Sequence, residues 1–368
     1  MNLVDLDALD TPALAVDVAR MELNLARVSG DVARAGIALR PHWKTSKCLE
    51  VARRQLALGA VGFTCSTPGE VRALGEAGIR GLLWAHLPVG APKVAFAVEA
   101  VAKYGTTLIA DSIEVARPVA EAVYAAGLVA DVFLEVDTGL GRTGVNPDAA
   151  VPVAAQIAAL PGLRLRGVMT HEGHLYGYGR DRAGLDAAAV ASAESLVDVA
   201  ESLRAAGHAI DVVSVGSTPG LAVGPYVPGV TEARPGTYVF DDGNQIRLGS
   251  CTLDDCALTV VARVVSTQRA GTVIIDAGSK ALSSDAVSAE TGYGKVLGAD
   301  GTPLLGVSFP RANEEHGFLV GPGVASLAVG DVVRILPHHA CATVNMWSEL
   351  IAENPDGSYE RWPVVARH

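Results

Sequence analysis

The sequence predicts an α/β fold: a (β/α)8 TIM-like barrel followed by a mostly antiparallel β-domain. From about residue 11 to about residue 240, short aliphatic runs alternate with longer amphipathic runs, which is typical of βα units. After about residue 250, β-branched runs follow one another between turn residues with little helical periodicity. At 368 residues the chain also exceeds the size at which one core keeps growing, so we expect one large and one smaller domain.

Eight aliphatic runs are the predicted strands of the barrel. They are Ala13–Val18, Ile37–Arg40, Gly62–Cys65, Leu82–Ala85, Thr107–Ala110, Asp131–Val136, Leu165–Met169 and Val212–Val215. Apolar residues at helical spacing predict six helices between the strands. These helices are Val18–Ala35, Lys47–Leu58, Pro68–Ala77, Ile113–Ala126, Ala149–Leu160 and Ala183–Ala206.

The change from βα repeats to short β-branched runs predicts a domain boundary at the polar stretch Asp241–Gln245. We therefore expect the barrel to span residues 11–245, and the β-domain to span residues 246–368 together with residues 1–10. The predicted strands of the β-domain are Ala257–Thr267, Thr272–Asp276, Gly317–Val320 and Asp331–Leu336.

Composition argues against several classes of function. The formal net charge is −11 and no cluster of Lys or Arg stands out, which argues against binding to nucleic acid or to an anionic membrane surface. Five scattered cysteines argue against a disulfide framework and favour a reducing compartment. The first residues, Met1–Asp5, lack the features of a signal peptide, and no apolar stretch is long enough to span a bilayer. We expect a cytoplasmic protein that acts on a small molecule.

Lys44 lies in the stretch Pro41–Lys47, directly after a predicted strand. A lysine in such a place is usually a solvated loop residue, but the C-terminal end of a barrel strand is also where barrel enzymes place catalytic groups. Together with Asp10–Asp17, this stretch resembles the start of the fold-type III pyridoxal-phosphate (PLP) enzymes, the alanine racemase-like barrels. More narrowly, it is similar to the D-serine dehydratase and D-threonine aldolase branch. The resemblance implies that Lys44 is the nucleophile that holds PLP as a Schiff base.

Two stretches are candidates for binding the cofactor phosphate. Ser217 and Thr218 follow the last predicted strand, where small residues let backbone amides approach a phosphate and hydroxyls can donate to it. Taken alone, such a stretch is more often an ordinary turn. The second stretch, around Arg234, resembles an alanine racemase motif. That resemblance implies that Arg234 faces the pyridine nitrogen and that Gly236 and Thr237 bind the phosphate, whereas the alternative for Arg234 is a surface salt bridge.

The loop Asp137–Gly144 also matches the racemase-like pattern, in which the arginine, here Arg142, lies near the phenolic oxygen of the cofactor. Its glycines do not form a dinucleotide fingerprint, because no Gly-x-Gly-x-x-Gly opens a helix there.

The stretch Thr170–Tyr176 ends another predicted strand. The resemblance implies that His171 stacks on the cofactor ring and that Tyr176 contacts the cofactor. Either histidine of this stretch could instead be a buried structural residue, and for His174 we favour that interpretation.

A candidate metal site lies near the C-terminus, at His339 and Cys341. In an extended segment these two residues share a face, so both can bind one metal ion while His338 points away. A lone His-x-Cys is common by chance. In the branch that this chain resembles, however, it is the metal position: the dehydratases carry His-x-Cys and bind Zn²⁺, whereas typical D-threonine aldolases carry His-x-Asp and use Mn²⁺ or Mg²⁺. A thiolate selects the softer zinc ion.

The resemblance implies a PLP- and zinc-dependent lyase for D-3-hydroxy amino acids, and the thiolate favours a dehydratase that forms a 2-keto acid and ammonia. The alternative is a metal-dependent D-threonine aldolase, which yields glycine and an aldehyde. A racemase is less favoured, because the context of Tyr293 does not resemble that of a racemase base. A non-catalytic PLP carrier is also less favoured, because such carriers lack a β-domain. Members of the family usually form homodimers, which we also expect here.

Overall fold

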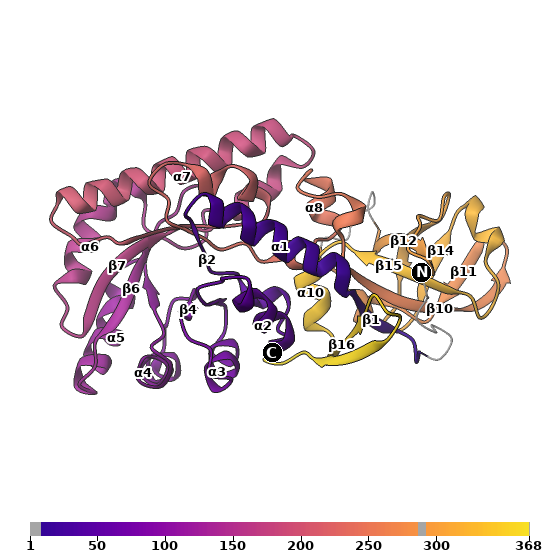
Figure 1. The fold of residues 1–368 in the computed structure, drawn as a ribbon, viewed down its shortest axis with the longest axis horizontal. Helices are drawn as coiled ribbons and strands as arrows, with labels where there is room; N and C mark the ends of the chain where they lie inside the picture. The colour runs from indigo at the N-terminus through magenta and orange to yellow at the C-terminus, as the bar shows by residue number, and fades with distance from the viewer. Residues whose placement is uncertain (1–8, 286–291, 368) are drawn as a thin grey trace. The chain divides into compact units, whose positions relative to one another are not determined.

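The computed structural model describes residues 9–285 and 292–367, so the Met1–Asp5 segment and most of the predicted 1–10 segment lie outside the described residues. The chain divides into two compact units (Figure 1). One unit comprises residues 26–44 and 51–236 and contains the barrel. The other comprises residues 1–25, 45–50 and 237–368 and contains the β-domain. The division therefore does not fall at a single point near residue 245.

Eight short parallel strands form the barrel. They are β2 (Ala38–Leu39), β3 (Thr64–Cys65), β4 (Leu83–Trp84), β5 (Leu108–Ala110), β6 (Ala130–Glu135), β7 (Leu163–Met169), β8 (Val212–Val215) and β9 (Glu232–Ala233). Six of them pair in the order β2-β9-β8-β7-β6-β5, and β3 pairs with β4. Parallel bridges between His42 and Thr64 and between Leu83 and Thr107 close the ring. The predicted (β/α)8 barrel is confirmed.

Helices follow the strands, and Figure 1 shows α4 to α7 on the outside of β6 and β7. The longer helices are α1 (Val18–Arg34), α2 (Leu49–Ala57), α3 (Pro68–Glu76), α4 (Ala91–Tyr104), α5 (Ile113–Ala125), α6 (Ala150–Ala158) and α7 (Arg182–Ala205). Helix α4 was not predicted, because exposed alanines such as Ala95 and Ala102 blur the contrast with its buried face.

One predicted barrel strand was wrong. Ala13–Val18 contains β1 (Ala13–Asp17), which pairs antiparallel with β10 and parallel with β16 of the β-domain. The barrel strand that was missed is β9, whose two residues are too short to show any periodicity. A strand buried in either domain gives the same aliphatic run, so the sequence alone could not assign β1 to its sheet.

The second unit is built on a nine-stranded sheet with the order β13-β14-β11-β10-β1-β16-β17, in which β15 pairs with β10 and β12. Its strands besides β1 are β10 (Leu258–Arg269), β11 (Thr272–Ile275), β12 (Gly294–Gly298), β13 (Ser308–Ala312), β14 (Gly317–Val320), β15 (Val332–Pro337), β16 (Glu349–Glu353) and β17 (Tyr359–Pro363). The short helices α8 (Gly243–Arg247), α9 (Ser279–Leu282) and α10 (Ala340–Asn345) complete it. All of these pairings except that of β1 with β16 are antiparallel, which confirms the predicted β-domain.

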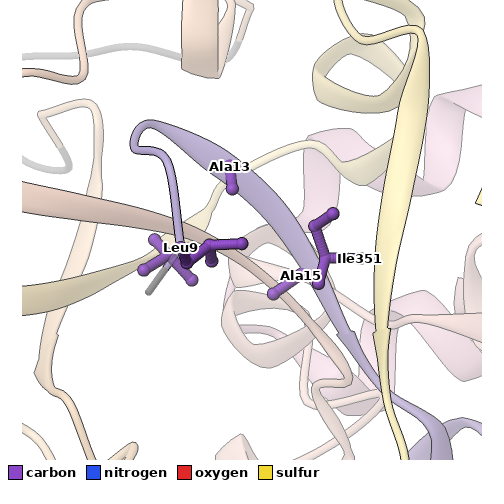
Figure 2. Packing of buried hydrophobic residues seen from close by; sticks show 5 residues of the cluster. Leu9, Ala13, Ala15 and Ile351 are labelled. Atoms are coloured by element: carbon purple, nitrogen blue, oxygen red, sulfur yellow. The ribbon is translucent and has the colours of Figure 1, made fainter. Parts of the chain in front are cut away.

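Small side chains let β1 pack tightly in this sheet. Ala13 lies opposite Val261 of β10, and Ala15 lies opposite Ile351 of β16. Figure 2 shows Ala13, Ala15 and Ile351 in one buried cluster with Leu9. Burial of this cluster fixes the segment from Leu9 to Ala15 in the β-domain. In the described part of the chain, no helix combines the length and the apolar character needed to cross a membrane.

Gly62 should tolerate substitution far less well than Gly78, although both have positive φ values, of 143° and 80° respectively. A Cβ atom at Gly62 would lie 2.1 Å from the Gly81 carbonyl oxygen, whereas one at Gly78 would meet nothing within 4 Å. We expect Gly78→Ala to cost about 1 kcal/mol from backbone strain and Gly62→Ala about 2–4 kcal/mol from strain plus overpacking. Urea unfolding of both variants measures the difference, and equal losses would contradict the close approach of the two glycines.

Candidate active site

Lys44 lies in a 3-10 turn (Trp43–Thr45) that follows β2 at the C-terminal edge of the barrel strands. The turn is anchored by Trp43, which is fully buried, while Lys44 itself is half-buried. The His42 amide donates a 2.9 Å hydrogen bond to the carbonyl of Pro235, the residue after Arg234. This bond fixes the start of the turn against the segment that follows β9.

Two neutral histidines and three cationic side chains gather at this edge of the barrel. Burial lowers the pKa of His42 well below its ordinary value, and the positive charges of Lys44, Arg234 and Arg142 lower it further. Burial likewise lowers the pKa of His171 to about 3, with Lys44, Arg142 and Arg234 adding to the shift. The His171 Nδ1 atom donates to the Gly216 carbonyl at 3.3 Å. Both imidazoles are therefore neutral at pH 7 and lie in a field of positive charge, which suits an anionic ligand.

Arg234 is buried rather than a surface residue, and it follows β9 directly. Its guanidinium donates to the Ser214 hydroxyl and to the Thr170 carbonyl. Ser214 in turn donates to Glu232 at 2.6 Å. Burial lowers the pKa of Arg234, while the carboxylates of Glu232 and Glu172 oppose that change. These bonds fix the guanidinium at the ends of β7, β8 and β9.

The Ser217 hydroxyl does not point its proton at a ligand. It donates to Glu172 Oε2 at 2.8 Å and accepts from the Gly220 amide at 3.2 Å. Ser217 and Thr218 of the predicted phosphate loop are both buried. We therefore expect a phosphate to bind to the Ser217 main-chain amide rather than to the Ser217 hydroxyl. The role of both hydroxyls toward a phosphate stays a prediction.

Glu172 should make the protein less stable as the pH rises. Burial raises its pKa from the ordinary 4.5 to about 7, although the Ser217 hydroxyl and the Arg234 charge oppose the shift. Because the folded state holds this proton more tightly than the unfolded chain, the associated stability is fully present below pH 4.5 and is lost as the pH rises to about 7. We expect Glu172→Gln to remove this loss, which is about 3 kcal/mol. Urea unfolding at pH 5 and pH 8 measures the free energy of unfolding of both proteins. If the difference in this free energy between wild type and variant is the same at both pH values, the assignment is wrong.

The loop that carries Arg142 is held by Asp137. The Asp137 carboxylate accepts from the amides of Gly139 and Gly141 at 3.0 and 3.1 Å. Burial raises the pKa of Asp137, but these amide bonds outweigh burial and lower it. Arg142 itself is exposed, and its charge is one of those that lower the pKa of His171.

Two other residues that are predicted to contact the cofactor, Tyr176 and Gly236, lie a few positions after His171 and Arg234 in the sequence. Tyr176 is half-buried in a 3-10 segment (Gly173–Tyr178), and Gly236 is half-buried two residues after Arg234. The His174 Nε2 atom lies 3.2 Å from the Ser192 hydroxyl of α7, in line with the structural role favoured for this histidine. The roles of these residues toward a cofactor stay predictions.

His339 and Cys341 come together, but not in an extended segment. Strand β15 ends at Pro337, His339 is the N-cap of α10, and Cys341 lies in the first turn of that helix. Burial lowers the pKa of His339, but its contacts with Cys341 and Asp285 outweigh burial and raise the pKa to about 10. The two side chains therefore converge because a helix begins there. His338 lies elsewhere, against Gly243.

Neighbouring groups fix the position of this pair. The Asp285 carboxylate pairs with His339 Nδ1, which leaves Nε2 for a ligand. Cys341 Sγ lies 3.1 Å from the hydroxyl of Thr45 and 3.9 Å from that of Thr237. Thr45 follows Lys44 directly in the sequence. Buried Asp242 accepts from the amide of Ala340 at 2.9 Å and so anchors the start of α10.

These residues fit the two groups that the resemblance implies. An amine at Lys44 suits an aldehyde, and the cationic surroundings of the neutral histidines suit a phosphate and a phenolate. An imidazole and a thiolate, with a carboxylate holding the imidazole, suit zinc. Within residues 9–285 and 292–367, no cluster of three or more His, Cys, Asp or Glu side chains could hold a metal ion, so protein ligands other than this pair are not visible there.

Comparison with models of protein families shows the family to which this chain belongs. The model of the alanine racemase N-terminal domain matches residues 16–242, and that of the D-serine dehydratase domain matches residues 257–352. The chain belongs to the alanine racemase-like family. Members of the alanine racemase-like and D-serine dehydratase families are PLP enzymes.

Relatives within this family span nearly the whole chain. D-threo-3-hydroxyaspartate dehydratase from Delftia sp. is 38% identical, over 96% of this chain and 97% of the relative. D-threonine aldolase from Arthrobacter sp. is 33% identical, over 97% and 93% respectively. Dehydratases and aldolases are lyases, and this member of the alanine racemase-like family is a lyase.

A solved structure of the Delftia dehydratase matches with a TM-score of 0.92 and 36% identity, over 97% of this chain and 98% of that one. Two variants of that enzyme have also been solved. One replaces a histidine with alanine, and the other replaces a cysteine two positions later and is described as metal-free. The spacing of these two residues is that of His339 and Cys341.

Sequence reasoning missed three residues that the structure places beside the predicted site residues. His42 stands two residues before Lys44 and was quoted only as part of the motif. Glu172 lies beside His171, and its burial gave no sequence signal because acidic residues are rarely buried. Asp285 is 54 residues from its partner His339, so no local pattern could pair them.

Proposed function

We propose that this lyase is a PLP- and zinc-dependent dehydratase that converts a D-3-hydroxy amino acid into a 2-keto acid and ammonia. The observation that carries the proposal is the convergence of Cys341 with His339 at the start of α10. A thiolate at this position selects zinc, whereas the carboxylate of an aldolase suits a harder ion. The metal-free cysteine variant of the Delftia dehydratase, with the same spacing, supports the same interpretation.

Lys44 would hold the cofactor and then act as the base. Its turn is anchored by buried Trp43, so the amine is presented from a fixed backbone. Its amine would remove the proton from the α-carbon of the substrate. PLP, when bound, supplies an electron sink for the charge left on that carbon.

The remaining residues bind and orient. Arg234, held by Ser214 and Thr170, would provide a fixed positive charge for the pyridine nitrogen and would favour its unprotonated form. Arg142 would provide charge for the phenolic oxygen, and His171 and Tyr176 would contact the ring. The backbone around Ser217, Thr218, Gly236 and Thr237 would bind the phosphate. His339 and Cys341 hold zinc, which supplies a Lewis acid for the β-hydroxyl, a poor leaving group on its own.

The second candidate is a retro-aldol cleavage to glycine and an aldehyde. It is supported by the 33% identity to D-threonine aldolase, which spans almost all of both chains. The two reactions differ in whether the base acts at the α-hydrogen or at the β-hydroxyl. Cys341 favours the dehydratase, because a thiolate selects zinc, whereas carboxylates suit harder ions.

A product assay separates the two reactions. Purified protein loaded with zinc and PLP is incubated with D-serine, D-threonine or D-threo-3-hydroxyaspartate. Ammonia with a 2-keto acid, lost with a chelator and restored by zinc, is the expected result. Glycine with an aldehyde would replace the dehydratase by the aldolase, and no reaction with any of the three would reject both.

A further inference from the structure

Glu172 is a buried carboxyl group without a role in the chemistry described above. It follows His171 directly, and its side chain is almost completely shielded from solvent. One oxygen, Oε2, accepts the Ser217 hydroxyl at 2.8 Å. The other, Oε1, is buried without a hydrogen-bond partner among the described residues. Such a group is costly to bury unless it does something for the fold or for a ligand.

In the described part of the chain, the hydrogen bond of the Glu172 carboxyl group is made to the turn after β8. The same Ser217 hydroxyl accepts the amide of Gly220 at 3.2 Å, so it is used both as donor and as acceptor within the turn. Gly220 packs against the carboxyl, because a Cβ atom there would come within 2.8 Å of Glu172 Oε2. Glu172 therefore fixes both ends of the turn from Ser217 to Gly220, one by a hydrogen bond and the other by contact.

We propose that Glu172 is a positioning residue that holds the Ser217–Gly220 turn in the shape in which the Ser217 backbone amide binds the phosphate of the cofactor. The inference rests on the proposed PLP function. Glu172 acts through Ser217, whose hydroxyl donates its hydrogen bond to Glu172, so the turn offers the Ser217 amide instead of that hydroxyl. Because a backbone amide cannot be reoriented by side-chain rotation, its direction depends on this support.

The neutral form of Glu172 suits this role. A buried carboxylate beside a phosphate would repel it, whereas a protonated carboxyl still accepts the Ser217 hydroxyl without adding negative charge. The charged side chain that acts on Glu172 is that of Arg234. The guanidinium of Arg234 is already hydrogen-bonded to Ser214 and Thr170. A glutamine, neutral at every pH and equally able to accept that bond, should replace Glu172 well.

The experiment compares two aldehydes that differ only in the phosphate. Wild-type protein and its variants, freed of cofactor, are titrated with pyridoxal 5′-phosphate and with pyridoxal, and the visible absorbance of the lysine-bound aldehyde gives each Kd. We expect Glu172→Ala and Ser217→Ala each to weaken binding of the phosphorylated aldehyde about ten- to a hundredfold, as the loss of a buried hydrogen bond does. Binding of pyridoxal should change less than about twofold, because it lacks the phosphate.

Two further variants test the mechanism of support. Glu172→Gln should keep a Kd for pyridoxal 5′-phosphate close to that of wild type. The double variant with alanine at both positions should bind no more weakly than either single variant, because both remove the same support. Equal weakening for the two aldehydes, no weakening, or additive effects would overturn the proposal.

Other outcomes are equally informative. If Glu172→Ala does not fold, Ser217→Ala carries the test alone, since it removes only one oxygen atom. If wild-type protein binds neither aldehyde through Lys44, the proposed function fails and this inference fails with it. If wild type binds both aldehydes and only the variant pattern departs from expectation, the positioning role fails while the proposed function stands.

Discussion

Replacing Lys44 by alanine should abolish turnover and the visible absorbance of the lysine-bound cofactor together. The amine is proposed both to hold the cofactor and to remove the α-proton, so its loss removes the covalent bond and the base at once. We expect turnover to fall by at least about a thousandfold. The absorbance spectrum of the purified variant and its rate with the best substrate measure the two effects.

Two control variants sharpen this test. Lys103→Ala removes an exposed lysine of α4 that pairs with Glu99 on the surface, and it should leave spectrum and rate unchanged. Lys44→Arg keeps the positive charge, but a guanidinium does not form a Schiff base, so it should lose the absorbance as completely as alanine does. A Lys44→Ala protein that keeps the absorbance would reject the assignment.

Replacing Cys341 by alanine should cost turnover at least about a hundredfold while leaving the cofactor absorbance intact, because zinc is proposed to act only on the β-hydroxyl. Treatment of wild-type protein with a chelator should give the same loss, restored by zinc but not in the variant. Metal content, absorbance and rate, measured on one preparation, separate the metal from the cofactor.

The same cysteine offers a matched control and a change of metal. Cys251→Ala removes another half-buried free cysteine of the same unit and should bind zinc normally. Cys341→Asp replaces a soft ligand by a carboxylate and should shift the preference from zinc toward manganese. If Cys341→Ala retains zinc and activity, the metal is held elsewhere, and the argument for a dehydratase loses its main support.

Several parts of the site could be found from local sequence alone. Lys44 and His171 each follow an aliphatic run, and in a parallel barrel the C-terminal ends of the strands meet at one edge. Arg234 was found only through its resemblance to a family motif, because β9 before it was not predicted. The structure adds that Arg234 is buried and braced by Ser214 and Thr170.

Other parts depended on contacts between distant segments. The pairing of His339 with Asp285 spans 54 residues, and the contact of Cys341 with Thr45 spans 296. Periodicity reports only local structure, so it predicted an extended segment where Asp242 anchors the start of a helix. For the same reason, the hydrogen bond of the Ser217 hydroxyl to Glu172, which lies 45 residues away, was not predicted.

The sequence by itself determined the fold class and predicted the lysine and the His-x-Cys pair as candidates, because hydrophobic periodicity and short motifs are local properties. Only the tertiary structure decided which sheet receives the aliphatic run of β1 and which two-residue strand, β9, closes the barrel. An aliphatic run gains about the same free energy from burial in either sheet. Its partner is chosen by the pairing and packing of residues hundreds of positions away, such as Ile351 against Ala15.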